Sequence, residues 1–418
     1  KRMGIAGPDD PRMKDIRSEA KARFYRPGKS LMVLGATSDA GKSVTVAAIC
    51  RMLHRKEYLV TPFKSQNMSL NSKVTRRGFE IAMIQTLQSQ AAGLRNPDQY
   101  MNPILLKPKE DNISQVIVEG EPYGDYDTKD YYEKFVPGPG VEIVRRNIEF
   151  LKKRYDFIMM EGAGSPAEIN IYDRDIANMG AAKIADAPCI LVVNVEWGGS
   201  FAYAVGTVKL IPEEDRSRIK GIILNNVRGD LSKMAEGAKE LEKILDIPVI
   251  GVIPHVDLYL PQEDSEALRD LESKGSGSMD ICVIRLPRIS NFTDIDPLYM
   301  EDTTVRFVTE PEELDGAGAI IIPGTKNTIS DIRWMKEKGL DKAIIKQKGK
   351  IPILGLCGGY QMMGRSLEDP NGLEDPRPGT TEGLGLFDNV TKWSEYKKRT
   401  VLSEGVLIKT GEKVTGYE

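Results

Sequence analysis

The sequence has only two histidines and four cysteines among its 418 residues. Four cysteines in a chain of this length do not make the disulfide framework of a small secreted protein. Cys50, Cys189 and Cys282 lie in apolar helix or strand patterns, which predicts buried thiols. Cys357 differs, because it stands beside glycines in the stretch ILGLCGGYQMMG.

Long apolar runs and a strong net charge are also missing. No run approaches the roughly 18 residues that a membrane-spanning helix needs, and the first thirty residues lack the apolar core of a signal peptide. A net charge of -3 gives no polycation for a nucleic-acid backbone. We therefore expect a cytoplasmic protein without nucleic-acid or membrane partners, and a homo-oligomer is left open.

The chain is long enough for two or three domains with ordinary cores. From Leu31 onward, continuous apolar runs alternate with helical patterns, which is typical of parallel sheets covered by helices. The predicted strands of a first set are 31–36, 59–64, 156–162, 188–196, 221–227 and 248–254, and those of a second set are 280–286, 319–324 and 352–357. The predicted fold class is α/β, with two mainly parallel sheets.

A loss of periodicity separates the two sets. The stretch EDSEALRDLESKGSGSMD ends in Gly and Ser, as linkers do. We predict an N-terminal extension without chemistry (1–30), a first domain (31–262), a linker (263–279) and a second domain (280–418). Because the sequence does not begin with Met, we expect further residues before it.

The stretch GATSDAGKSVT (35–45) follows the first predicted strand and opens a helix. A Gly-Lys-Ser at that point predicts a P-loop, in which backbone N–H groups face phosphates, Lys42 reaches the outer oxygens and Ser43 ligates Mg²⁺. The competing interpretation is a chance glycine-rich turn. The expected ATP-binding residues are Thr37, Asp39, Ala40, Gly41, Lys42, Ser43 and Val44.

A magnesium ion needs a further oxygen ligand. Glu161 ends a predicted strand at the carboxyl edge of the sheet, where ligands bind in open α/β folds. The same edge would bring Lys64 towards the phosphates. The alternative for Glu161 is a strand-end carboxylate that faces water.

Several longer segments carry a resemblance to a known family. The loop spacing resembles the dethiobiotin synthetase group, and Ala36 and Thr37 stand where partitioning ATPases carry an extra lysine. Together with this loop, four segments closely resemble the cobyric acid synthases, the glutamine-dependent amidases of cobalamin biosynthesis. They are PFKSQNMSLNS (62–72), MNPILLKP (101–108), EGAGSPAEINIYDRDIANMG (161–180) and RLPRISNFTD (285–294).

This resemblance implies an ATP-dependent first domain that converts carboxylates b, d, e and g of adenosylcobyrinic acid a,c-diamide into acyl phosphates, which ammonia displaces. Asn225 matches a position that reads adenine, although a strand-end Asn can instead cap a helix. The residues implied for the corrinoid are Gln66, Asn67, Ser69, Asn71, Glu168, Asn170, Asp173 and Asp175. By residue type alone, they fit equally well a polar surface loop with Asx turns.

The second domain resembles a class I glutamine amidotransferase. A strand, a sharp turn and a helix start around Cys357 are typical of a nucleophile elbow, and the resemblance makes this thiol the attacker of glutamine. Gly324 of IIPGTKNTISD (321–331) is implied as an oxyanion donor. The alternative is a buried cysteine that ends a core strand.

Two departures from the family pattern limit the prediction. The family's activating histidine lies well downstream of the cysteine, whereas His54 and His255 both precede it. We therefore expect the chain to continue beyond Glu418. Trp197 stands where the family pattern has an arginine, which leaves the choice of carboxylates open. The alternatives are a cobyrinic acid a,c-diamide synthase and a partitioning-type ATPase.

Overall fold

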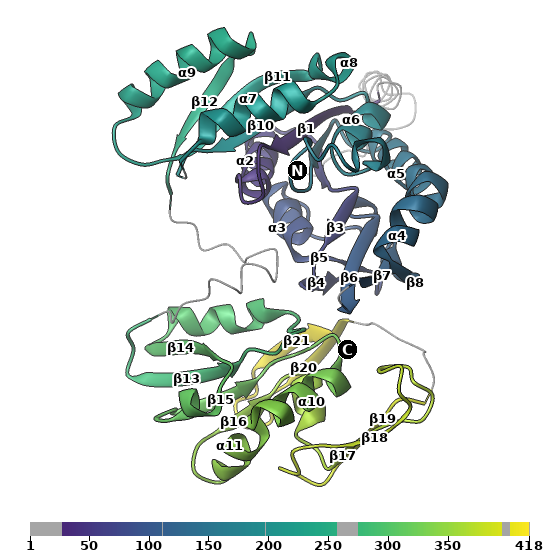
Figure 1. Cartoon of the computed structure of the whole chain (residues 1–418), viewed down its shortest axis with the longest axis vertical. Helices are drawn as coiled ribbons and strands as arrows, with labels where there is room; N and C mark the ends of the chain where they lie inside the picture. Colours follow the sequence, from purple (N-terminus) through teal and green to yellow (C-terminus); the bar gives the residue numbers. More distant parts are fainter. Residues whose placement is uncertain (1–26, 111, 197, 257–274, 395–401, 418) are drawn as a thin grey trace, which may run out of the picture.

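The computed structural model describes residues 27–110, 112–196, 198–256, 275–394 and 402–417. Two α/β bodies lie one above the other in Figure 1, which confirms the predicted fold class. Most of the predicted extension and linker falls outside the described residues, so the domain boundaries stay a prediction. Across the described ranges, no helix has the length and apolar character needed to cross a membrane.

The first body is built on a sheet of six parallel strands in the order β12-β11-β10-β1-β9-β2. All six runs predicted for the first set form these strands. Their bounds are β1 Lys29–Gly35, β2 Val60–Phe63, β9 Phe157–Glu161, β10 Cys189–Asn194, β11 Ile219–Val227 and β12 Val249–Pro254.

Helices cover both faces of this sheet, as the continuous apolar strands require. Met32 and Leu34 of β1 pack in a large core with helices such as α5 and α6, while Val33 packs on the other face against α2. This division follows from the alternation of side chains along a strand. The helices are α2 Lys42–Arg55, α5 Val141–Lys152, α6 Met179–Ala185, α7 Ser200–Leu210, α8 Glu213–Arg216 and α9 Leu231–Leu245.

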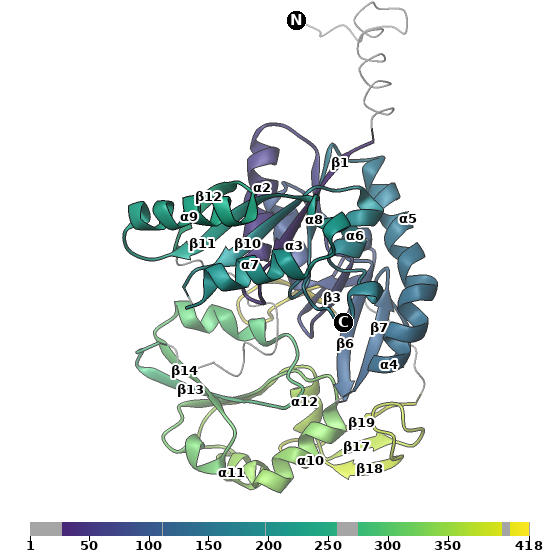
Figure 2. The ribbon, with the colours of Figure 1, turned by 45° about the horizontal axis from the view of Figure 1, so that its top comes forward.

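An insertion after β2 forms a second layer that was not predicted. A four-stranded sheet in the order β3-β6-β7-β8 and a hairpin of β4 and β5 lie between the first sheet and the second body (Figure 1), and Figure 2 gives the same placement of β6 and β7. The elements are β3 Gln66–Met68, β4 Ser72–Val74, β5 Glu80–Ala82, α3 Met83–Ala91, η1 Gln99–Met101, β6 Ile104–Glu110, β7 Ile113–Val118, β8 Glu121–Asp127, α4 Thr128–Asp130 and η2 Tyr131–Gly140.

The second body contains a parallel sheet in the order β14-β13-β15-β16. Three of these strands were predicted, and β14 was not. The elements are β13 Met279–Ile284, β14 Thr303–Val308, β15 Ala319–Ile322, α10 Thr328–Lys338, α11 Leu340–Lys346, β16 Ile353–Gly355, α12 Gly358–Met362, β17 Ser366–Asp369, β18 Gly379–Glu382, β19 Val390–Lys392, β20 Leu402–Val406 and β21 Lys413–Tyr417.

Helix α10 begins and ends at residues suited to those positions. The Asn327 side chain accepts a hydrogen bond from the Ser330 backbone N–H, and Gly339 ends the helix with a φ of 77°. The start of α10 therefore fixes the loop that precedes it, which carries Gly324.

Candidate active sites

The glycine-rich loop joins β1 to α2 and has the geometry that a P-loop needs. Gly41 has a φ of 94°, and a Cβ at this position would lie 2.1 Å from Nδ2 of Asn225. Only glycine fits both the backbone angle and the close approach. The Asn225 amide donates to the Ala40 carbonyl, 3.1 Å away, so Asn225 lies against the loop. Its proposed contact with adenine stays a prediction.

Lys42 is 7% exposed and folds over the loop. Its Nζ donates to the carbonyl oxygens of Thr37 and Gly164, at 3.2 and 3.0 Å. Nearby, the Asp39 carbonyl accepts a hydrogen bond from Asn194. Phosphate oxygens are stronger partners for an ammonium than neutral carbonyls are. The lysine is therefore already directed to the loop region where phosphates would bind.

Glu161, at the end of β9, is 1% exposed and joins the elements around the loop. Its Oε1 accepts hydrogen bonds from Ser43 Oγ at 2.8 Å and from Lys64 Nζ at 2.9 Å. Its Oε2 accepts one from Gln88 Nε2. The structure thus brings the predicted Ser43, Glu161 and Lys64 together, and the Lys64 ammonium pairs with the Glu161 carboxylate.

Gln88 was missed by the sequence analysis. It lies on α3 and is fully buried, and the neighbouring Gln85 is too. Positions 85 and 88 share one helix face. Helix α3, with the sequence MIQTLQSQA, carries three glutamines, a threonine and a serine, so its pattern gave no signal that Gln88 is buried at a site.

The residues present fit a magnesium ion. A serine hydroxyl and a carboxylate are the hard oxygen donors that Mg²⁺ prefers, and those of Ser43 and Glu161 lie 2.8 Å apart. Gln88 Oε1 is buried and has no hydrogen-bond partner among the described residues. It is a further oxygen beside the same carboxylate.

The residues implied for the corrinoid divide into two groups. Gln66, Glu168 and Asp175 line one pocket, with Tyr132 and Tyr172. Asp175 also organises the loop, because its carboxylate accepts hydrogen bonds from three backbone N–H groups at 2.8 to 3.0 Å. The remaining residues do not line this pocket: Asn67, Ser69 and Asn71 are buried, whereas Asn170 and Asp173 are exposed.

Cys357 lies on a sharp turn between β16 and α12. Its φ is 48° and its ψ is −111°, a conformation that is rare for a side-chain-bearing residue, and it is exposed. A Cβ at Gly359 would lie 2.0 Å from the Ile322 carbonyl oxygen, so the turn depends on glycine there. A Cβ at Gly324 would lie 3.6 Å from Cys357 Cβ, which places the predicted oxyanion residue beside the thiol.

The other three cysteines are buried, as predicted. Burial raises the pKa of Cys50 and of Cys189 to about 12, and that of Cys282 to about 11. A thiol reacts as its thiolate, so these three are poor nucleophiles at neutral pH.

Comparisons with known proteins match both bodies of the chain. The profile of the CobQ/CobB/MinD/ParA nucleotide binding domain matches residues 31–265, and that of the CobB/CobQ-like glutamine amidotransferase domain matches residues 280–418. The probable cobyric acid synthase of Methanothermobacter thermautotrophicus is 48% identical over 399 residues, which are 93% of this chain and 79% of that protein. The chain belongs to the cobyric acid synthase family.

Two further family members give the same result. The probable cobyric acid synthase of Methanosarcina mazei is 49% identical, over 93% of this chain and 81% of its own length. The cobyric acid synthase of Geobacillus thermodenitrificans is 46% identical, over 93% and 78%. Among solved structures, the MinD cell division protein of Aquifex aeolicus is 18% identical over 55% of this chain and 83% of its own, with a TM-score of 0.31, too low to carry an argument.

In this member of the cobyric acid synthase family, a buried carboxylate, Asp331, and a partly buried one, Glu374, hold the loop that contains Gly324. Asp331 accepts a hydrogen bond from Thr325 Oγ1 at 2.5 Å, and Glu374 accepts one from the Thr328 backbone N–H at 2.6 Å. Burial raises the pKa of both carboxyl groups. The loop beside Cys357 is therefore fixed from two sides.

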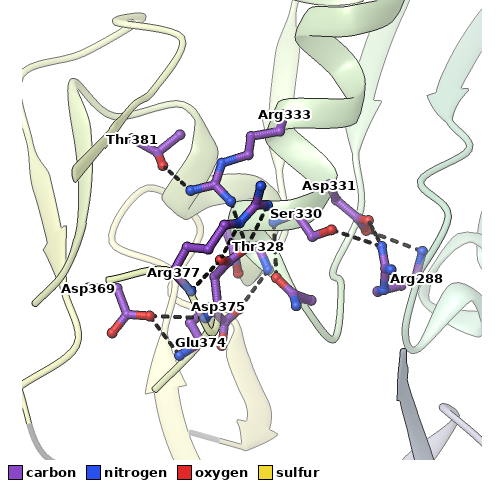
Figure 3. A network of polar contacts seen from close by, with 11 residues as sticks. Arg288, Thr328, Ser330, Asp331, Arg333, Asp369, Glu374, Asp375, Arg377 and Thr381 are labelled. Carbon is purple, nitrogen blue, oxygen red and sulfur yellow. Dashed lines mark hydrogen bonds and ion pairs between the residues drawn. The ribbon is translucent and has the colours of Figure 1, made fainter. Parts of the chain in front are cut away.

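Figure 3 shows how this network continues outward on each side. Arg288 pairs with Asp331, with 3.3 Å between NH1 and Oδ1. On the other side, Asp369 accepts hydrogen bonds from the backbone N–H groups of Glu374 and Asp375, and Asp375 pairs with Arg333 at 2.7 Å. These contacts link the loop to the β17–β18 sheet.

Three hydrogen bonds connect this region to the inserted layer of the first body. Lys326 Nζ donates to Gln115 Oε1 at 2.7 Å, Arg288 Nε donates to a carbonyl at 2.8 Å, and the Ser72 backbone N–H donates to Asn291 at 3.1 Å. The carbonyl belongs to Lys109 of β6. A cleft at this junction is lined by Asn112, Ile113, Arg288, Asn327, Ser330, Asp375, Pro376 and Arg377.

The two histidines belong to the first body, where His54 is exposed and His255 is partly exposed. The His54 ring lies against Gly93, and the His255 ring contacts Arg228 at 2.9 Å. Arg228 also pairs with Glu196, and Trp197 lies outside the described residues.

Proposed function

We propose that this protein amidates side-chain carboxylates of a corrinoid, with ATP as the activator and glutamine as the nitrogen donor. The observation that carries the proposal is the presence in one chain of a P-loop beside the Ser43–Glu161 pair and a cysteine elbow beside Gly324. The relatives named cobyric acid synthase share both halves of the chain.

In the first body, a substrate carboxylate oxygen attacks the γ-phosphorus of ATP, an acyl phosphate forms and ADP leaves. Ammonia then attacks the acyl carbon, the bond from that carbon to the bridging oxygen breaks, phosphate leaves with that oxygen, and loss of a proton from nitrogen gives the amide. Lys42 offsets the repulsion between the two anions. Mg²⁺, which Ser43 and Glu161 would hold, supplies further neutralisation of phosphate charge.

The substrate is adenosylcobyrinic acid a,c-diamide, amidated at b, d, e and g to give adenosylcobyric acid. The pocket that contains Gln66, Glu168 and Asp175 supports this assignment, since amide and acid groups hydrogen-bond to a ligand that carries both.

In the second body, the Cys357 thiolate attacks the side-chain carbonyl of glutamine, and Gly324 donates an N–H to the oxyanion. Ammonia leaves and a glutamyl thioester remains, which water hydrolyses to glutamate. Neither His54 nor His255 is proposed as the base, because both belong to the first body, His54 on α2 and His255 directly after β12.

Two substitutions test this division of labour. We expect Lys42→Met to abolish amidation of the a,c-diamide with either ammonium or glutamine, and Cys357→Ser to abolish only the glutamine-dependent reaction. Lys342→Met, at an exposed position of α11, is the surface control. Glutamine-dependent amidation that survives both substitutions would refute the proposal.

The same architecture would also serve a cobyrinic acid a,c-diamide synthase. Incubation with cobyrinic acid and, separately, with its a,c-diamide separates the two functions by the masses of the products. Diamide formation from cobyrinic acid alone would favour the second function. ATP-dependent dimerisation with no product from either corrinoid would favour a partitioning-type ATPase.

A further inference from the structure

Gln88 occupies an unusual position for a neutral polar side chain. It is fully buried on α3, yet its Nε2 reaches two elements of the nucleotide site. It donates to Glu161 Oε2 at the end of β9 and to the Ser43 carbonyl, 3.3 Å away, in the first turn of α2. Gln88 therefore joins α3 to both residues that would hold the ion.

The other end of the same amide has no partner among the described residues. Gln88 Oε1 is buried and accepts no hydrogen bond there. Buried carbonyl groups are almost always hydrogen-bonded, and an exception calls for an explanation such as an ion or a water molecule. This oxygen belongs to the side chain that already donates a hydrogen bond to Glu161. An ion bound at the Glu161 carboxylate would therefore give Gln88 Oε1 a partner.

The charges of the neighbours explain a glutamine here. Lys64 and Glu161 already form a buried ion pair with 2.9 Å between their atoms. A second carboxylate would leave an uncompensated negative charge in this buried site when no ion is bound, which is costly. An amide adds an oxygen without a charge, and its N–H fixes the carboxylate that it contacts.

We propose that Gln88 is a positioning residue of the magnesium site, which orients Glu161 through its N–H and offers its carbonyl oxygen to the hydrated ion. The inference rests on the proposed nucleotide site and deepens it. It does not depend on the corrinoid or on glutamine. Partners that orient metal-binding carboxylates typically contribute 10- to 100-fold to metal affinity.

The test measures ion binding without turnover. Mn²⁺ binding in the presence of ADP is followed by electron paramagnetic resonance, and ADP binding without metal by calorimetry. We expect Gln88→Met to weaken Mn²⁺ binding about 10-fold or more. Metal-free ADP binding should stay the same, because the substitution leaves Lys42 and the loop backbone in place.

A matched control comes from Gln99 of η1, which is 3% exposed and whose Oε1 also has no hydrogen-bond partner in the part of the chain that the structure describes. Gln99→Met should leave Mn²⁺ binding unchanged. If Gln88→Met does not fold, Gln88→Asn decides, since it keeps an amide but withdraws it from Glu161. Unchanged Mn²⁺ affinity in a folded Gln88 variant, or an equal loss in Gln99→Met, would overturn the inference. Because no corrinoid is present, failure of amidation would leave this result standing.

Discussion

Two carboxylates of the second body hold the loop that contains Gly324 at an electrostatic cost. Glu374 is largely buried and accepts a hydrogen bond from the Thr328 backbone N–H. Asp331 accepts a hydrogen bond from the Thr325 hydroxyl and pairs with Arg288. Burial disfavours the charged form and raises the pKa of both groups, while the hydrogen bonds oppose that effect. These two carboxylates therefore lower the stability of the fold when they are charged, while their hydrogen bonds fix the geometry of the loop.

The cost of burying the charged carboxylate predicts a pH-dependent effect of Glu374→Gln on stability. A raised pKa in the folded state means that this carboxyl group favours folding below its ordinary pKa, and that the benefit disappears as pH rises through the raised value. Glutamine keeps an oxygen for the Thr328 N–H but carries no charge. We expect the variant to melt at a higher temperature than the parent at pH 7 to 8, and the difference to vanish towards roughly pH 4.

Thermal unfolding between pH 4 and 8 measures this difference. Glu382→Gln is the control, because its side chain is 92% exposed and its removal should change little at any pH. A lower melting temperature for Glu374→Gln at pH 7 would show that the hydrogen bonds outweigh the cost of burial.

At the scale of elements, the run of apolar residues within a strand decided whether that strand could be predicted. The six strands of the first sheet are continuous apolar runs, so their positions were clear from sequence. Strand β8, EPYGDYD, is largely exposed, and β14, TTVRFV, is only partly buried. Such strands owe their place to their neighbours and not to their own pattern.

The sites divide in the same way. Glu161 ends a strand, and Ser43 and Cys357 lie beside glycine turns that join a strand to a helix, where chain geometry alone indicates a site. Gln88 lies within a helix, where a polar residue usually faces water. Only the packing of α3 against β9 and α2 reveals that it is buried beside Glu161.

The elbow before α12 gives a prediction at this scale. A Cβ on Gly359 would lie 2.0 Å from the Ile322 carbonyl oxygen and 2.7 Å from that of Pro323, and backbone atoms cannot move aside as a side chain could. We expect Gly359→Ala to lower stability by about 3 kcal/mol, at the upper end of common single substitutions. Displacement of the turn should abolish glutamine-dependent amidation and spare the ammonium-dependent reaction.

Circular dichroism melting and the two amidation assays test this expectation. Gly206→Ala in α7 is the control, because a Cβ there meets nothing within 4 Å and alanine favours helix. A Gly359→Ala protein with normal glutamine use would show that the elbow tolerates a shifted backbone.

At the scale of the whole molecule, the inserted layer of the first body contacts the second body. Gln115 of its strand β7 accepts a hydrogen bond from Lys326, which belongs to the same loop as Gly324. The Lys109 carbonyl of its strand β6 accepts a hydrogen bond from Arg288, which also pairs with Asp331 behind that loop. These two contacts between the bodies thus reach the loop that contains Gly324 and the carboxylate behind it, so we expect the first body to influence the position of this loop.

This arrangement predicts that Lys326→Met impairs the use of glutamine and not that of ammonium. Loss of the bond to Gln115 loosens the loop, and couplings of this kind alter activity by roughly 3- to 30-fold. Gln115→Leu removes the same bond from the other body, so the double variant should lose no more than either single variant. Lys342→Met is the surface control. Losses that multiply in the double variant would mean that the two residues act separately, and equal losses with ammonium would mean that the contact supports the whole fold and not the loop.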